Sequence, residues 1–116
     1  MPLLAPPDRR VTVALRLLRR VFAELPSPLL FRLWDGTDAP VGAPGDGGFA
    51  VVFHSRPVFR RILLNPTPFR FGEAYIAGEI DIEGDVFAAM RVANEIEALR
   101  VPFGTRLAVL AGLLRI

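Results

Sequence analysis

Hydrophobic residues near the start of the chain recur with the period of an α-helix. Between residues 8 and 25 they follow one another every three or four positions, and Pro26 and Pro28 come directly afterwards. This spacing predicts an amphipathic helix that Asp8 caps and the prolines terminate, after an irregular arm over residues 1–7. The apolar face of this helix comprises Val11, Leu15, Leu18, Phe22 and Leu25. The opposite face comprises Arg9, Thr12, Arg16, Arg19 and Arg20.

Three other segments have the patterns of β-strands. Residues 29–34 and 49–54 are short runs of bulky apolar side chains, and residues 79–83 alternate strictly between acidic and apolar positions. An alternation with a period of two predicts a half-buried strand whose acids point to water. The stretch 40–48 is rich in glycine, proline and aspartate, and it predicts a turn or loop between the first two strands.

Helices are expected through most of the second half of the chain. Ser55, Arg56 and Pro57 form a helix start, and that helix continues to Leu64. A second helical segment covers residues 69–77, with Gly78 as its left-handed C-cap.

A longer helix is expected over residues 86–99, with Asp85 as its N-cap, and Arg91 and Glu95 are predicted to pair on its outer face. Thr105 is expected to cap a last, apolar helix over residues 105–116. The inner stripe of the 86–99 helix comprises Val86, Ala89, Met90, Ala93 and Ile96.

Together these elements predict one α+β domain spanning residues 1–116. We expect a small, mainly antiparallel sheet with helices packed on one face. The start of the chain lacks the pattern of a signal peptide, and the longest apolar run is far shorter than the roughly 18–20 residues that span a bilayer. We therefore expect a cytoplasmic protein that touches a membrane without crossing it.

The composition is apolar for a domain of this size. Hydrophobic residues make up 52% of the chain and charged residues 22%, so the surplus must enter a large core, a ligand cavity, a partner or a membrane surface. All 14 basic residues are arginine, and the charges fall in blocks. Residues 49–72 hold four arginines and no acid, whereas residues 73–97 hold seven acids against Arg91.

Most site chemistries are disfavoured by the residues themselves. Cysteine is absent and His54 is the single histidine, so we expect no metal site and a structural or solvent-facing role for His54. The glycines of residues 45–48 lead into a strand rather than a helix, so they do not form a dinucleotide fingerprint. We expect no cofactor and no catalytic residue in this chain. For Glu73 two interpretations stay open, a buried structural carboxylate or a general base.

The arginines allow more than one interpretation. Anionic phospholipid headgroups suit an amphipathic helix with arginines on one face, and a solvated basic face explains the same pattern. A further basic cluster comprises Arg56, Arg60, Arg61 and Arg70. No motif typical of nucleic-acid binding accompanies either group, so we expect no nucleic acid as a partner.

Residues 71–78 resemble the Gly-Glu-x-Tyr-x-x-Gly signature in the N-terminal domain of bacterial cyclopropane-fatty-acyl-phospholipid synthases. The motif residues are Gly72, Glu73, Tyr75 and Gly78. Residues 57–63 look like the helix that precedes this signature. Many members carry tryptophans after the last glycine, whereas this chain continues with an alternating segment, residues 79–85. That segment is similar to the end of a sterol-carrier-protein-2-like domain.

The resemblance implies a sterol-carrier-protein-2-like fold and a role in lipid biosynthesis. A full-length synthase adds a methylene from S-adenosylmethionine across a cis double bond of a phospholipid acyl chain. The methyltransferase domain that binds S-adenosylmethionine would lie outside this chain, as a partner in cis or in trans, and a homodimer is also possible.

We therefore expect a non-catalytic domain that binds lipid and lies peripheral to the inner membrane. The residues expected to contact acyl chains are Phe69, Phe71, Tyr75 and Ile76. The residues expected to meet headgroups are Arg9, Arg16, Arg19 and Arg20. Three alternatives remain: an interaction module that docks through its C-terminal helix, a free-standing lipid carrier, and an enzyme with Glu73 as base.

Overall fold

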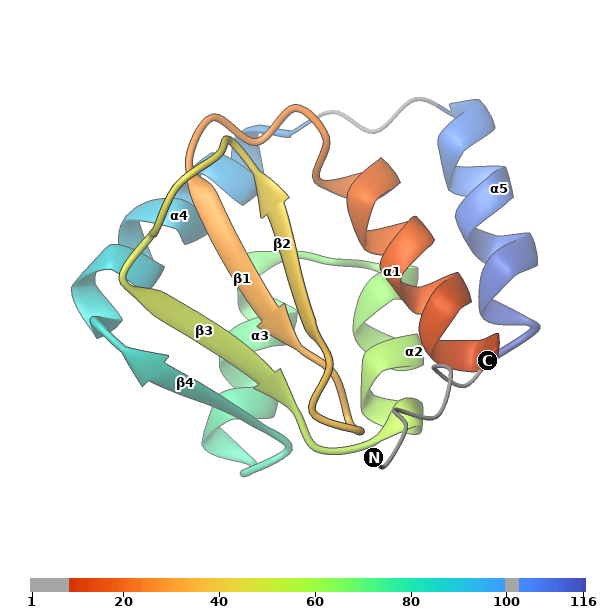
Figure 1. Ribbon diagram of the computed structural model, residues 1–116, viewed down its shortest axis with the longest axis horizontal. Helices are drawn as coiled ribbons and strands as arrows, with labels where there is room; N and C mark the ends of the chain where they lie inside the picture. Colours follow the sequence, from red (N-terminus) through yellow and green to blue (C-terminus); the bar gives the residue numbers. More distant parts are fainter. Residues whose placement is uncertain (1–8, 100–102) are drawn as a thin grey trace, which may run out of the picture.

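The computed structural model describes residues 9–99 and 103–116, which fold around one four-stranded sheet (Figure 1). The elements in chain order are α1 (Arg9–Val21), β1 (Pro28–Arg32), β2 (Asp38–Gly42), β3 (Phe49–Phe53), α2 (Arg56–Leu64), α3 (Pro68–Ile76), β4 (Ile80–Gly84), α4 (Val86–Ala98) and α5 (Phe103–Leu113).

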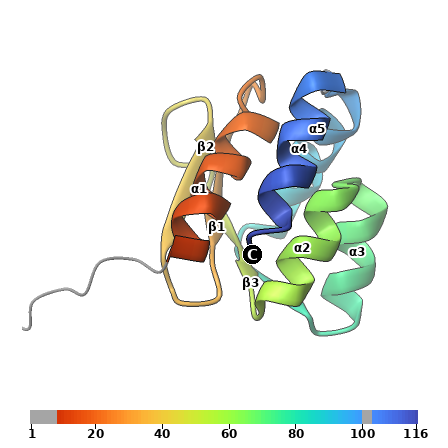
Figure 2. The same cartoon turned by 90° about the vertical axis from the view of Figure 1, so that its right-hand side faces the viewer.

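The sheet has the strand order β2-β1-β3-β4 and is mixed. The β1–β2 and β3–β4 pairs are antiparallel, and the central β1–β3 pair is parallel. Helices α2, α3 and α4 lie behind the sheet in the view of Figure 1. Helix α1 lies next to the β2 edge, and α5 packs against α1 and α2 (Figures 1 and 2). The predicted α+β class, with a mainly antiparallel sheet, is confirmed.

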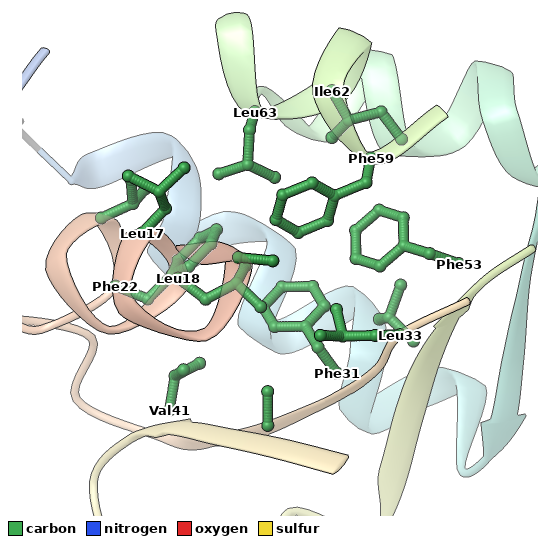
Figure 3. Close-up of a cluster of buried hydrophobic side chains, with 14 of the residues drawn as sticks. Leu17, Leu18, Phe22, Phe31, Leu33, Val41, Phe53, Phe59, Ile62 and Leu63 are labelled. Carbon is green, nitrogen blue, oxygen red and sulfur yellow. The ribbon is translucent and has the colours of Figure 1, made fainter. Parts of the chain in front are cut away.

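A chain of aromatic rings forms the centre of the core (Figure 3). The ring of Phe31 lies 5.2 Å from that of Phe22 and 5.5 Å from that of Phe53. Phe53 contacts Phe59 edge-on at 5.1 Å, and Phe59 contacts Trp34 at 5.5 Å. Tilted and edge-on pairs of this kind add stability beyond the area that they bury. The rings connect α1, β1, β3 and α2 into one core.

Helix α1 is four residues shorter than predicted. It ends at Val21, and Phe22 and Leu25 continue to bury their side chains from the turn that follows. The buried face also differs slightly, because Leu17 is buried while Leu15 is only partly buried. The predicted cap Asp8 and the predicted arm lie outside the described residues.

Strand β2 corrects the prediction that residues 40–48 form only a turn or loop. Its residues alternate, so that Ala39 and Val41 point into the core while Asp38 and Pro40 are exposed. Proline is unfavourable in central strands, but β2 lies at the edge of the sheet, where a missing backbone donor is tolerated. Pro40 therefore marks an edge strand and not a turn.

The caps of α2 and α4 follow the sequence signals. The Ser55 hydroxyl accepts a hydrogen bond from the Val58 amide, and the Asp85 carboxylate accepts from the amides of Phe87 and Ala88. Such bonds satisfy amides that have no partner within the first helical turn. The predicted starts of both helices are confirmed.

Helix α5 begins at Phe103, two residues earlier than predicted, so Thr105 lies within the helix and does not cap it. It packs closely against α1 because Gly112 has no side chain. A Cβ atom at Gly112 would lie 2.7 Å from a methyl carbon of Leu17. None of the helices in the described residues has the length and hydrophobicity needed to cross a bilayer.

Candidate functional site

A small apolar cleft lies between the inner face of the sheet and the helices α3 and α4. We call it the sheet cleft; it has a volume of about 220 Å³. Of its sixteen lining residues, only Tyr75 has a polar group in its side chain. The lining consists of Leu29, Phe31, Phe49, Val51, Pro68, Phe71, Gly72, Tyr75, Ile80, Ile82, Val86, Ala89, Met90, Val92, Ala93 and Ile96.

One wall of the sheet cleft is the stripe of α4 that the sequence assigned to the core. All five residues of that predicted inner stripe line the cleft. Val86 and Met90 are exposed at its rim, so the prediction that they are buried is wrong. Ala88 and Val92 are the buried residues of α4 instead. The helix thus buries Ala88 and Val92 and leaves Val86 and Met90 exposed beside the cleft.

The opposite wall comes from α3. Phe71 stacks on Phe31 with ring centres 6.2 Å apart, which fixes the floor of the cleft against the core. Tyr75 follows one turn later and is exposed at the rim. Gly72 lies between them, and a Cβ atom there would meet nothing within 4 Å.

A second, larger hollow opens between the end of α1, the turn from α2 to α3, the end of α4, and α5. We call it the helix cleft; its volume is about 660 Å³. Its lining is mainly apolar, with Glu97 and Arg106 as its charged residues. Phe69 and Leu64 stand exposed at its edge.

The four residues expected to contact acyl chains are divided among three locations. Phe71 and Tyr75 line the sheet cleft, and Phe69, which is 72% exposed, lines the helix cleft. Ile76 is 86% exposed at the end of α3 and lies outside both clefts. The structure therefore brings two of the four together.

Within the Gly-Glu-x-Tyr-x-x-Gly motif, Gly78 has a structural role. It has φ of 76°, its amide donates to the Tyr75 carbonyl, and the Glu79 amide donates to the Ala74 carbonyl. These two bonds form a Schellman motif, which ends α3 and turns the chain into β4. The predicted left-handed cap is confirmed.

Glu73 does not fit either interpretation proposed for it. It is exposed on α3 and lines neither cleft, so the expectation of a buried structural carboxylate is wrong. A general base also needs a cleft in which substrate meets it, and Glu73 lines neither the sheet cleft nor the helix cleft.

The arginines of α1 lie on its exposed side, whereas the second basic cluster is divided. Arg9, Arg16, Arg19 and Arg20 are exposed on α1, which packs against α5 and β2. In α2, Arg61 forms an ion pair with Glu79, and the hydrogen bond and charge of Arg61 lower the pKa of the Glu79 carboxyl. Arg56 donates to the Ile116 carbonyl at 3.5 Å.

The acids of β4 are not simply solvated. Asp81 lies 2.9 Å from His54, and Glu83 lies 2.7 Å from Arg32, which also bonds Asp38 across the sheet. Among residues 9–99 and 103–116, no group of three or more His, Asp or Glu side chains is placed to hold a metal ion.

The predicted ion pair between Arg91 and Glu95 does not form in the structure. Glu95 instead accepts a hydrogen bond of 2.6 Å from the Ser27 hydroxyl, which lies 68 residues away in the chain. The other carboxylate oxygen of Glu95 is buried and has no hydrogen-bond partner among the described residues. The tertiary contact therefore replaces the local i, i+4 pair.

Two groups of residues at these surfaces escaped the sequence analysis. The α4 stripe was recognised but assigned to the core, because periodicity does not distinguish a core from a cleft. Arg106 and the exposed leucines of α5 were treated only as parts of an apolar helix. The leucines are spaced by three and four residues, and this spacing alone could have indicated that they share one face of the helix.

Comparisons with known proteins place the chain in a family. The family model described as a domain of unknown function, DUF7884, matches residues 16–98. A stretch of 73 residues is 32% identical to a probable fatty acid methyltransferase from Pseudomonas putida. That stretch covers 62% of this chain but only 18% of the relative. No solved structure matches significantly, and the expected sterol-carrier-protein-2-like fold stays a prediction. The chain belongs to the DUF7884 family.

Proposed function

We propose that this domain is a non-catalytic, lipid-binding accessory unit of a fatty-acid-methyltransferase-like protein that uses S-adenosylmethionine. It holds part of a phospholipid acyl chain in the sheet cleft, while chemistry takes place on another part of the protein. The similarity to a probable fatty acid methyltransferase supports this setting, because the matched stretch is a small part of that relative.

The observation that carries the proposal is the chemistry of the sheet cleft. Its lining has no charged side chain, and Tyr75 supplies its single polar side-chain group. A polar ligand would lose hydrogen bonds to water here without regaining them, whereas a hydrocarbon gains about 0.8 kcal/mol for each methylene buried. The cleft therefore favours an acyl chain over a nucleotide, a sugar or a peptide.

The size of the sheet cleft suits a domain that holds part of an acyl chain for an enzyme, rather than a carrier that encloses a whole chain. A volume of about 220 Å³ has room for several methylene groups but not for a complete membrane acyl chain, since a water molecule alone takes about 30 Å³. The remainder of the chain would extend past the exposed rim formed by Tyr75, Val86 and Met90. A chain held at one end and free at the other stays accessible to an enzyme.

The test is calorimetric titration of the protein with oleate below its micelle concentration. We expect measurable binding with a negative heat-capacity change, because apolar surface is buried. Tyr75→Glu puts a charge at the cleft rim and should weaken binding at least about tenfold. Ile76→Glu is the matched control, since it changes the next residue of the same helix outside the cleft.

Equal loss of affinity in both variants would contradict the assignment of the cleft. Absence of oleate binding by the unaltered protein would reject the proposed function. Far-UV circular dichroism of each variant separates a lost contact from a lost fold.

A further inference from the structure

Three helices that lie together carry arginines but no acid. Helices α1, α2 and α5 contain five, three and one arginines respectively, and none contains Asp or Glu. Helix α5 packs against both α1 and α2. Of the seven acids in segment 73–97, Asp81 and Glu83 lie on β4, whereas Glu79 pairs with Arg61 of α2 and Glu97 lines the helix cleft with Arg106. The three helices together therefore carry a positive charge, and Glu97 lies at their border.

The middle helix of the three exposes a row of leucines. Leu107 and Leu110 are about half exposed at the edge of the helix cleft, and Leu114, which directly follows α5, is 82% exposed. We call this row the leucine crest. The opposite face of α5 buries Val109 and Leu113, so the helix packs against the protein and leaves the crest without a partner among the described residues. Single apolar residues scattered over a surface are normal, whereas three exposed leucines in one row form a contiguous apolar patch of the kind that marks an interaction site.

Arginines flank the leucine crest on the neighbouring helices. Leu17 contacts Gly112 of α5, and Arg16 and Arg20 lie on the adjoining exposed side of α1. On α2, Arg60 is exposed one turn before Leu64, which lines the helix cleft beside the crest. No acid of the described residues lies within ion-pair distance of Arg16, Arg20 or Arg60. Their charges are thus available to an external anion.

We infer that the leucine crest and its flanking arginines form a face that docks on an anionic lipid bilayer. Apolar side chains enter the boundary between headgroups and acyl chains, and arginines bind lipid phosphates bidentately. A second copy of this chain is a poor occupant, because it would bring the arginines of α1, α2 and α5 against the same arginines, and these helices carry no acid. Nucleic acid matches the charge but leaves the leucines in water.

The inference rests on the proposed lipid function and adds an orientation to it. The acidic segment 73–97 is repelled by the same surface that attracts α1, α2 and α5. The domain therefore meets the membrane with its α1–α5 face.

Co-sedimentation with phosphatidylglycerol-containing and pure phosphatidylcholine vesicles tests the face. We expect binding to the anionic vesicles that weakens as salt rises. Leu107→Gln/Leu114→Gln should lower the partition at least about tenfold, and Arg16→Gln/Arg20→Gln roughly thirtyfold. Phe87→Gln and Arg91→Gln are matched controls on α4, where Phe87 is 75% exposed, and they should bind as the unaltered protein does.

The face is rejected if the anionic vesicles do not retain the protein, or if the α4 controls lose as much binding as the crest variants. Binding of a DNA duplex that depends on Arg16 and Arg20 but not on the leucines would assign the arginines to nucleic acid instead. Oleate titration without vesicles separates the two proposals, because the crest variants leave the sheet cleft intact. Loss of oleate binding alone overturns the function, and loss of vesicle binding alone overturns the docking face.

Discussion

At the scale of single residues, Gly72 and Gly78 belong to one motif but meet opposite backbone requirements. Gly78 adopts φ of 76°, a left-handed conformation that costs other residues roughly 1–2 kcal/mol. Gly72 lies in the interior of α3, where glycine is less favourable than alanine by about 1 kcal/mol. A Cβ atom at either position meets nothing within 4 Å, so the two sites differ in backbone conformation and not in space.

We therefore predict opposite changes in stability from the same substitution. Gly78→Ala should lower the free energy of unfolding by about 1 kcal/mol, and Gly72→Ala should raise it by about 0.5–1 kcal/mol. Urea denaturation of both variants measures the two values. A change of the same sign in both would mean that the Schellman motif does not govern the end of α3.

At the scale of elements, the ion pair between Arg61 and Glu79 ties α2 to the residue that precedes β4. This ion pair adds a side-chain contact to the turn after α3. The backbone hydrogen bonds of the Schellman motif stabilise the same turn. Arg61 is exposed and Glu79 is half-buried, so the pair contributes modestly and is sensitive to salt. The contribution of this pair to the free energy of unfolding is best measured as a function of pH.

Arg61 lowers the pKa of Glu79 in the folded state, chiefly through their hydrogen bond. A group with a depressed folded pKa contributes stability above its unfolded pKa and loses it as pH falls through the folded pKa. We predict that Glu79→Gln is less stable than the unaltered protein at neutral pH. The difference should shrink as pH falls below the ordinary range of a glutamate and should disappear only below the lowered folded pKa, where the carboxylate is protonated in both states. Urea midpoints across this pH range provide the measurement, and a difference that persists in acid would contradict the pairing.

Most elements could be predicted from the sequence because their signals are local. Ser55 and Asp85 are caps whose bonds reach only three residues, and the alternation of residues 79–83 is visible within one strand. Strand β2 was missed because its identity depends on its pairing with β1, which places Pro40 opposite Leu30 at a sheet edge. The pairing of Glu95 with Ser27 was missed for the same reason.

The candidate site was predicted only in part. The motif directed attention to α3, and Phe71 and Tyr75 do line a cleft. The α4 wall was identified by its period but not by its role, because the packing of Ala88 and Val92 sets the rotation of the helix. Which apolar face remains uncovered is decided by the whole fold.

At the scale of the whole molecule, one core connects the elements that carry the two proposed surfaces. Phe22 of the turn after α1, Phe31 of β1 and Phe59 of α2 belong to the same chain of rings. The β1–β3 pair joins the two halves of the sequence at the centre of the sheet. The helices that carry the leucine crest and the strands that floor the sheet cleft should therefore unfold together.

We predict a single cooperative unfolding transition. Trp34, the one tryptophan of the chain, packs against Phe59 and reports on the core, whereas far-UV circular dichroism reports on all helices. The two signals should follow the same curve in urea, as two-state folding of a small domain requires. A separate early loss of helical signal would indicate that part of the helical layer is an independent unit.

The floor and the rim of the sheet cleft differ in how freely they can change during evolution. Phe31, Val51 and Ile80 belong to the floor and are also buried core residues, so a substitution there disturbs folding as well as binding. Tyr75 and Met90 at the rim are exposed and carry little of the core. Selectivity among ligands can therefore diverge at the rim from one descendant of this domain to another, while the inherited floor keeps the architecture constant.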